Sequence, residues 1–184
     1  MAFATPSNAQ HVQMRGGGRA RYNIGMSDAA IVRAIVGFHQ DDAGDWVAEL
    51  RCGHGQHVRH KPPFWSRPWV LTAEGRAEKL GAELPCVLCE RFEMPSGFAP
   101  YKRTQDFTAD TIPQGLRNQH STKPGVWAVI HVVEGRLRYV VEPPLAREQI
   151  VTPEQPAVVV AEVLHRVEPQ GDVRFFVEFH RRSE

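Results

Sequence analysis

The sequence predicts a mainly β protein in two domains, a small α+β domain of zinc-ribbon-like character followed by a C-terminal β-barrel. The second half of the chain contains short β-rich runs separated by turn residues, with almost no helical periodicity. All three cysteines lie in the first half, beside several histidines, which favours a metal site there. We therefore expect a disordered tail at residues 1–29, a Cys/His domain at residues 30–91 and a barrel at residues 92–184.

Composition excludes several classes of protein. The 184 residues carry a net charge of +1 with 23% charged residues, so no global field favours nucleic acid or acidic membranes. No apolar run approaches the roughly 20 residues of a membrane span. Residues 1–29 are polar and glycine-rich and contain no apolar segment of a secretory signal, which predicts a disordered tail and a soluble, cytoplasmic protein.

The first domain begins with a predicted hairpin. Residues 31–38 are rich in β-branched side chains and residues 46–50 alternate, and the turn-forming Asp41-Asp42-Ala43-Gly44 segment separates the two runs. Thr72 is typical of a helix N-cap, so we expect a helix from Ala73 to about Leu80.

In the second domain, residues 92–112 show no sustained period and contain several prolines, which indicates a linker or an irregular lead-in. Five strands are predicted beyond it, at residues 126–133, 136–141, 149–152, 157–161 and 173–179. They are separated by turn-forming residues, namely Glu134-Gly135, Pro143-Pro144, Pro153 and Gln170-Gly171-Asp172.

Cys52, Cys86 and Cys89 form the first candidate metal site. The Cys-x-x-Cys spacing lets two sulfurs face one ion, and in a chain without a signal segment it indicates thiolate ligands rather than a disulfide. Zinc needs a fourth ligand, which His54, His57 or His60 could supply, and His54 and His57 are the two that we retain. Because a domain of about sixty residues buries little core, this Zn²⁺ would be structural.

Residues 31–91 resemble a small bacterial family of unknown function. The resemblance rests on Ala-Ile-Val-Gly-Phe at 34–38, Cys-Gly-His-Gly-Gln-His-Val-Arg-His at 52–60, Pro62-Pro63, Arg-Pro-Trp-Val at 67–70 and the closing Cys-x-x-Cys. It implies no activity.

Residues 94–182 resemble the TehB-like cupin family, which is linked to tellurite resistance and includes YeaR-like proteins. The matching segments are Leu116-Arg117, His120 to Trp127, Val133-Glu134-Gly135, Glu162 to Pro169 and Val173 to Phe179. The resemblance implies a cupin-type jelly-roll β-barrel that holds a divalent metal ion, without a settled reaction.

His120 and His165 lie where the two metal motifs of a cupin barrel stand, and Glu162 could add an oxygen ligand. The sequence departs from the general cupin pattern, because Thr122 and Trp127 occupy the places of the second His and the Glu of its first motif. The expected barrel metal is Zn, Fe, Mn or Ni. Glu178, in an apolar strand, would orient a ligand histidine or form an ion pair.

The leading functional hypothesis is a metal-binding, stress-response protein that binds a small anionic ligand, with Arg117 and Lys123 beside His120 as candidate anion contacts. One alternative is a metalloenzyme such as a dioxygenase, in which two histidines and a carboxylate bind Fe, Mn or Ni. Another is a nucleic-acid or protein adaptor; nucleic acid is disfavoured by the nearly neutral charge. Cupins often dimerise, so a homodimer is the default expectation.

Overall fold

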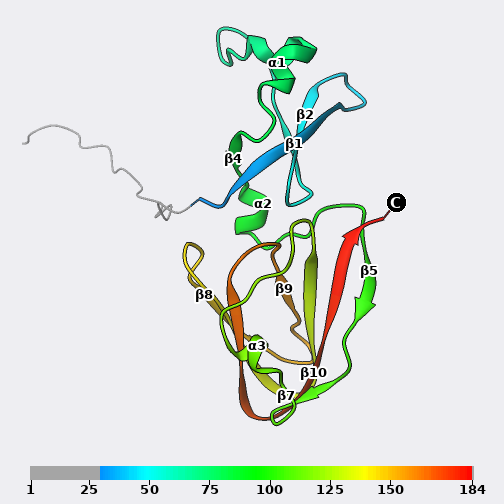
Figure 1. Cartoon of the computed structure of the whole chain (residues 1–184), viewed down its shortest axis with the longest axis vertical. Helices are drawn as coiled ribbons and strands as arrows, with labels where there is room; N and C mark the ends of the chain where they lie inside the picture. Colours follow the sequence, from blue (N-terminus) through cyan, green and yellow to red (C-terminus); the bar gives the residue numbers. More distant parts are fainter. Residues whose placement is uncertain (1–29, 184) are drawn as a thin grey trace, which may run out of the picture.

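The computed structural model describes residues 30–183. They form two parts, with the smaller N-terminal part above the β-rich C-terminal part in Figure 1. The chain crosses from one part to the other between α2 (Val87–Glu90) and β5 (Phe98–Arg103). The tail predicted for residues 1–29 lies outside the described residues.

A four-stranded antiparallel sheet in the order β3-β2-β1-β4 forms the N-terminal part. Its strands are β1 (Val32–Gln40), β2 (Trp46–Leu50), β3 (Gly55–His57) and β4 (Glu83–Pro85). Asp41 shapes the turn between β1 and β2, because its carboxylate accepts hydrogen bonds of 2.9 Å from the backbone N–H groups of Ala43 and Asp45. The predicted hairpin is therefore confirmed.

Short helical segments connect β3 to β4 and follow β4. They are η1 (Pro68–Leu71), α1 (Ala73–Ala77) and α2. Thr72 is the N-cap of α1, as predicted, and its hydroxyl accepts a hydrogen bond of 3.0 Å from Gly75 N–H. The helix ends before the predicted Leu80, because the chain tightens there into a turn in which Leu80 N–H bonds to Ala77 O. No helix of the described residues is long and apolar enough to cross a bilayer.

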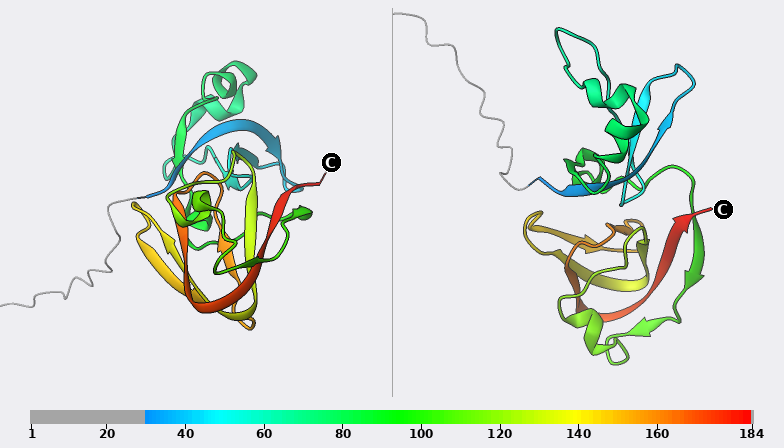
Figure 2. Two further views of the ribbon diagram at one scale, coloured as in Figure 1. Left: turned by 60° about the horizontal axis from the view of Figure 1, so that its bottom comes forward. Right: turned by 45° about the horizontal axis from the view of Figure 1, so that its top comes forward.

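A six-stranded sheet forms the C-terminal part, with the order β5-β10-β7-β8, while β6 pairs with β10 and β9 pairs with β7. Its elements are β5, β6 (Phe107–Thr108), α3 (Gln114–Arg117), β7 (Trp127–Val141), β8 (Arg147–Val151), β9 (Ala157–Val159) and β10 (His165–Arg182). The sheet curls into a half-barrel, as Figure 2 shows. The chain is thus mainly β, as predicted, whereas the jelly roll and the zinc ribbon stay predictions.

Two long strands replace some of the predicted short ones. Residues 126–133 and 136–141, expected to be separate, lie in the 15-residue strand β7. Gly135, at φ 79°, bends this strand where its register with β10 shifts, so the predicted turn is a bend within a continuous strand. Residues 92–112 are also more ordered than expected, since they contain β5 and β6, both paired with β10.

One hydrophobic cluster extends through both parts of the chain. Trp127, at the start of β7, is fully buried in this cluster. Its indole Nε1–H donates a hydrogen bond of 2.8 Å to the backbone oxygen of Cys52 in the N-terminal part. The loop that carries Cys52 is therefore fixed against the half-barrel.

We expect Gly135→Ala to destabilise the protein by roughly 2 to 5 kcal/mol, because an alanine there would be strained at positive φ and its Cβ would collide with the backbone oxygen of Asp172. Gly171→Ala is the matched control, since Gly171 also has positive φ but open space around it, and should cost only about 1 kcal/mol. Urea unfolding of both variants measures the difference. Equal losses would show that the contact with Asp172 has no effect.

Candidate metal centre and barrel cavity

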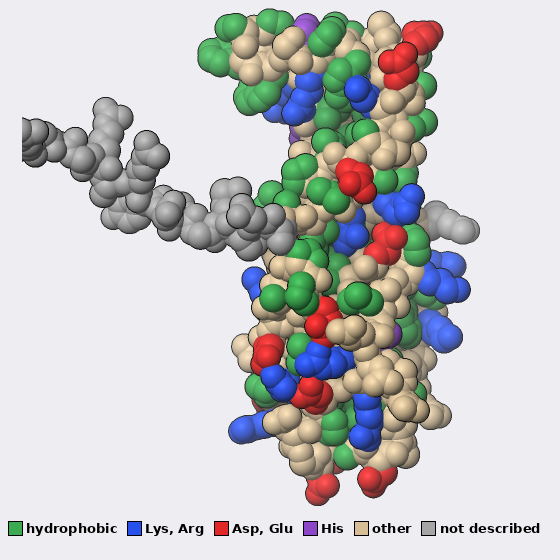
Figure 3. Space-filling model, turned by 60° about the vertical axis from the view of Figure 1, so that its left-hand side comes forward, with side chains coloured by type: hydrophobic (Ala, Val, Ile, Leu, Met, Phe, Trp, Pro, Cys, Tyr) green, Lys and Arg blue, Asp and Glu red, His purple; other side chains and the backbone are tan. Residues whose placement is uncertain are grey.

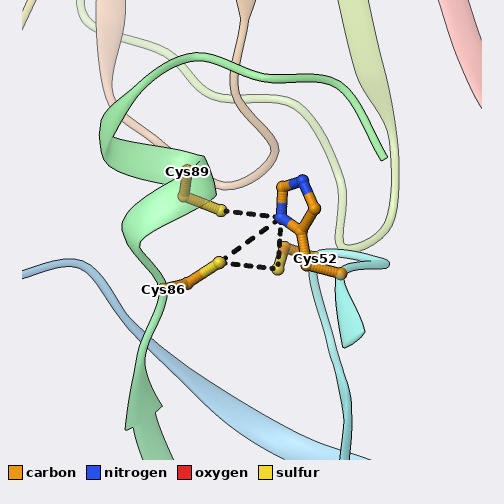
Figure 4. A group of neighbouring side chains, drawn as sticks. Cys52, Cys86 and Cys89 are labelled. Carbon is orange, nitrogen blue, oxygen red and sulfur yellow. Dashed lines mark hydrogen bonds between the residues drawn. The ribbon is translucent and has the colours of Figure 1, made fainter. Parts of the chain in front are cut away.

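Three thiols and one imidazole converge where the two parts of the chain meet. Cys52 lies in the loop after β2, Cys86 is the N-cap residue of α2, and Cys89 lies within that helix. The ligand atoms of these cysteines and of His54 all lie within 4.8 Å of one another, and all four residues are buried. Figure 4 shows the three thiols directed at one imidazole nitrogen. The cysteines form no disulfide.

The spacing of these atoms fits a tetrahedral ion. Zinc–sulfur bonds of about 2.3 Å place two sulfurs about 3.8 Å apart, with a slightly shorter distance between sulfur and nitrogen. Here Cys52 Sγ lies 3.8 Å from Cys86 Sγ, and His54 Nδ1 lies 3.5, 3.3 and 3.7 Å from the sulfurs of Cys52, Cys86 and Cys89. The donor set and its spacing therefore suit a divalent ion that prefers thiolate and imidazole ligands.

His54 is oriented for ligation by its second nitrogen. Its Nε2–H donates a hydrogen bond of 3.0 Å to the backbone oxygen of Glu93, which leaves Nδ1 directed at the thiols. Burial opposes protonation of the ring, but hydrogen bonds to Cys52 and Cys86 outweigh it and raise the pKa of His54 to about 9. In the metal-free protein the imidazole is thus a cation beside the sulfurs.

The thiols share their protons unequally. Hydrogen bonds from Cys52 and Cys89 hold the pKa of the Cys86 thiol well below its usual range. Hydrogen bonds to Cys52 and Cys86, together with burial, raise the pKa of Cys89. In the metal-free cluster, Cys86 is therefore the thiol that more readily loses its proton and Cys89 the one that retains it, and a bound cation would replace the protons shared by these groups.

The other two histidines considered for this site lie elsewhere. His57 Nε2–H donates a hydrogen bond of 2.7 Å to the Asp41 carboxylate, at the exposed side of the hairpin. His60 Nδ1 accepts a hydrogen bond of 2.9 Å from the backbone N–H of Arg67. Of the candidate fourth ligands, the structure thus brings only His54 to the thiols.

His120 and His165 meet in the half-barrel. Their backbones exchange two hydrogen bonds, of 3.0 and 2.8 Å, and their ring centroids lie 4.2 Å apart. Each Nδ1–H donates to a backbone oxygen, that of Asn118 at 3.0 Å for His120 and that of Val163 at 2.9 Å for His165. Both Nε2 atoms consequently carry a lone pair that can bind a metal or accept a proton donor.

The two histidines line a cavity of about 360 Å³. Apolar side chains from β7 and β10, such as Ile130, Phe175 and Val177, form much of its wall. Lys102 and Lys123, which are both exposed, also line the cavity. The cavity therefore combines apolar walls, two imidazole acceptors and two ammonium groups.

The carboxylates predicted for the barrel site do not join the histidine pair. Glu162, at φ 61°, points its oxygens toward Arg33 and Arg51, each 3.9 Å away. Glu178 is separated from the cavity by the alternation of β10, which turns Phe175, Val177 and Phe179 inward. It lies 3.0 Å from His180 Nε2 and 3.9 Å from His131 Nε2. Glu178 thus contacts His131 and His180 and neither of the cavity histidines that it was expected to orient.

Arg117 also lies outside the cavity wall. Arg117 is the last residue of the short helix α3, and its guanidinium donates a hydrogen bond to the backbone oxygen of Ala109 in the preceding turn. Lys123 lines the cavity, and its role as an anion contact stays a prediction.

Sequence reasoning missed Lys102 and Arg33. Lys102 lies in β5, within the segment expected to be a linker or an irregular lead-in, and residues 98–103 show no alternation that would indicate which side chains face inward. Arg33 lies in β1 and is only 9% exposed. A single arginine in an apolar strand gives no indication of what it faces.

Removal of one of the four ligands should strongly weaken metal binding. We expect the wild type to hold about one Zn²⁺ per chain at this centre, and both Cys86→Ser and His54→Ala to weaken Zn²⁺ binding by at least about 100-fold, because each removes one of four bonds to the ion. His57→Ala is the control and should bind as the wild type does. Mass-spectrometric metal analysis and chelator competition measure both quantities. A loss in His57→Ala equal to that in His54→Ala would contradict this assignment.

The buried His165 should make stability depend on pH. Burial, with a smaller contribution from the charge of His120, lowers its pKa from 6.5 to about 4. Between pH 4 and pH 6.5 the unfolded chain therefore binds more protons than the folded chain, so the free energy of unfolding falls as the pH falls. About 3 kcal/mol of stability is present above pH 6.5 and is lost by pH 4. We expect His165→Gln, but not His39→Gln at an exposed site, to reduce this slope in urea unfolding with a chelator present. An unchanged slope in His165→Gln would contradict the prediction.

The chain matches two family models. Residues 36–93 match the model described as a protein of unknown function (DUF3565), and residues 102–177 match the TehB-like domain. Comparison with curated proteins gave no match.

Solved structures similar to the chain include TehB from Haemophilus influenzae, with 28% identity and a TM-score of 0.44; the match covers 47% of this chain and 32% of that protein, so the chain spans about a third of its length. A protein from E. coli K12 is 23% identical with a TM-score of 0.46, over 50% of this chain and 98% of that one. The family comparison therefore places a match to the TehB-like domain at residues 102–177, preceded by a match to the DUF3565 domain at residues 36–93.

Proposed function

We propose that the chain is a metal-stabilised binding protein of the TehB-like type, in which the half-barrel binds a small anionic ligand and Zn²⁺ stabilises the N-terminal domain. The observation that carries this proposal is the cavity of about 360 Å³, whose apolar wall also carries two imidazoles and two lysines. Such a concave site with a few polar groups is typical of small-molecule binding.

The zinc assignment rests on chemistry and on size. Three thiolates with one imidazole are a common ligand set of structural zinc. The N-terminal sheet has four strands, of which β3 and β4 contain three residues each, so it buries little apolar surface by itself. A bound ion would supply stability that this small core lacks. A fully ligated ion of this kind leaves no open position for a substrate.

The lining of the cavity selects the ligand. Val159, Val167 and Phe179 line it together with the apolar residues of β7, and these walls favour an organic body over a bare inorganic ion. Lys102 and Lys123 would attract a negative charge, and the Nε2 atoms of His120 and His165 would accept a hydrogen bond from the ligand. A small organic acid satisfies the first two conditions, and a hydroxyl group on that acid would donate the hydrogen bond to the imidazoles, because an ionised carboxylate is only an acceptor.

A divalent ion in the half-barrel, whether Zn, Fe, Mn or Ni, would have His120 and His165 as its protein ligands. The dioxygenase alternative is less well supported, because it needs a carboxylate beside the two imidazoles. Within residues 30–183, the only group of three or more metal-ligating residues found is the Cys/His centre. An ion at the histidine pair would thus depend on ligand or water for its remaining bonds.

The nucleic-acid alternative has little electrostatic support. On the face shown in Figure 3, Lys and Arg side chains are interspersed with Asp and Glu side chains. The net charge of the chain is +1. A phosphate backbone is bound by a positively charged surface, and the mixed charges on this face do not form one.

The proposal also includes a cytoplasmic location, a homodimer and a role in the stress response that is linked to TehB-like proteins.

Ligand binding can be tested with small carboxylates. We expect hexanoate or benzoate to bind the protein, and Lys102→Ala and Lys123→Ala each to weaken binding roughly two- to fivefold, since exposed ion pairs contribute modestly. Arg117→Ala is the matched control, a cation outside the cavity that should change nothing. Isothermal titration calorimetry measures the affinities.

Two further ligands sharpen this test. Hexanol, the neutral counterpart of hexanoate, should bind more weakly than the acid, and equal affinities would contradict the role of the lysines. Tellurite is the inorganic comparison. If tellurite binds and the carboxylates do not, the site recognises an oxyanion, and the assignment of an organic ligand is wrong.

A further inference from the structure

A buried cation lies next to the Cys/His centre. Arg33, on β1, is 9% exposed, and burial of a guanidinium is costly unless its charge and its N–H groups are matched. One N–H group donates a hydrogen bond of 2.7 Å to the backbone oxygen of Ala161. Its Nε is also buried, and within the described part of the chain no acceptor is assigned to it. Such an orphaned donor indicates that a partner is missing from its surroundings.

The centre itself can supply the missing charge. Arg33 pairs in register with Leu84 of β4, two residues before the ligand Cys86, and the Cys86 backbone N–H donates a hydrogen bond of 2.8 Å to Ile31 O, so β1 lies directly against the segment that leads into the centre. A Zn²⁺ ion bound by three thiolates and one neutral imidazole has a net charge of −1. A buried net charge is unfavourable, and a guanidinium beside it removes most of that penalty. Arg33 is thus positioned to balance the loaded centre.

The other contacts of Arg33 lead to the half-barrel. Ala161 and Glu162 belong to the segment between β9 and β10, immediately before the cavity residue His165. Glu162 Oε2 lies 3.9 Å from Arg33 Nη1. One side chain therefore connects the thiol cluster of the N-terminal part to the segment that positions His165.

A second set of contacts joins the Cys/His centre to the half-barrel. The His54 ring meets the Trp127 ring edge to face, with 5.4 Å between centroids. The backbone oxygen of Cys52 accepts the hydrogen bond of the same indole. The neighbours of Trp127 in sequence, Val126 and Ala128, line the cavity. The metal ligands thus contact the cavity wall through Trp127.

We infer that Arg33 is a positioning residue that neutralises the metal–thiolate centre and couples metal binding to the attachment of the half-barrel. This inference rests on the metal centre of the proposed function. In the loaded protein, the guanidinium lies between the negatively charged centre and Glu162, and the segment before His165 is fixed against the N-terminal part. Without the ion, the centre loses its net negative charge and this attachment weakens.

Zinc affinity tests the electrostatic half of the inference. Residues that hydrogen-bond to metal ligands typically contribute about 10- to 100-fold to metal affinity, so we expect Arg33→Met to weaken Zn²⁺ binding about 10-fold in chelator competition. Arg33→Lys, which keeps the charge, should recover part of this loss. Arg51→Met is the matched control: Arg51 lies at the same 3.9 Å from Glu162, but its side chain is 52% exposed. Its affinity for zinc should be that of the wild type.

Hydrogen exchange tests the coupling. In the full-length wild type, added Zn²⁺ should slow amide exchange by about 10-fold at residues 126–132 and 160–165, which belong to the half-barrel and hold none of the four ligands. In Arg33→Met saturated with Zn²⁺, this protection should be absent although the ion is bound. Arg33→Lys provides a second variant if the methionine variant is poorly folded.

The outcomes separate the two proposals. If the wild type binds no Zn²⁺, the metal centre is wrong and the role of Arg33 with it. If the wild type binds Zn²⁺ but Arg33→Met matches Arg51→Met in affinity and in exchange, the metal centre stands and the coupling is overturned. Weaker Zn²⁺ binding and lost protection from exchange in Arg33→Met, but not in Arg51→Met, would support both the metal centre and the coupling.

Discussion

The approach of three thiols to one imidazole, inside 4.8 Å and out of water, is the constraint on which the arrangement of this chain depends. Like groups with their lone pairs directed at a common point are stable only when protons or a cation lie between them. The ligands come from the loop after β2 and from α2. An ion or shared protons between them therefore hold α2 against the loop of the N-terminal sheet. Trp127 then fixes the loop to the half-barrel through the Cys52 oxygen.

In the half-barrel, polar groups lie inside an apolar wall. Alternation along β7 and β10 directs apolar side chains inward and leaves Glu178 with His180 on the other face. His120 and His165 are tolerated inside because each Nδ1–H has a backbone acceptor. Their remaining nitrogens, with the lysines of the wall, give the cavity its chemical character and make a ligand-binding role the best supported one.

Sequence reasoning succeeded where local rules decide the outcome. The hairpin around Asp41, the N-cap at Thr72 and the Cys-x-x-Cys motif follow from turn chemistry, capping and ligand spacing, and the structure contains all three. Sequence reasoning did not determine which residues the charged side chains contact. Glu162 was expected at the histidines and instead faces Arg33 and Arg51, because its left-handed backbone directs it toward the N-terminal part.

By itself, the sequence determined the mainly β class, the position of the thiols along the chain and the pairing of two histidine-bearing segments, since these depend on residue type and periodicity. Only the tertiary structure decided between His54 and His57 as the fourth ligand, and only it placed Lys102 and Lys123 together in one wall. It also revealed that Arg33, on the strand beside the one that leads to Cys86, contacts the half-barrel at Ala161 and Glu162. The reason is physical: contacts between residues far apart in the sequence depend on how the strands and the two sheets pack, and no local pattern encodes that packing.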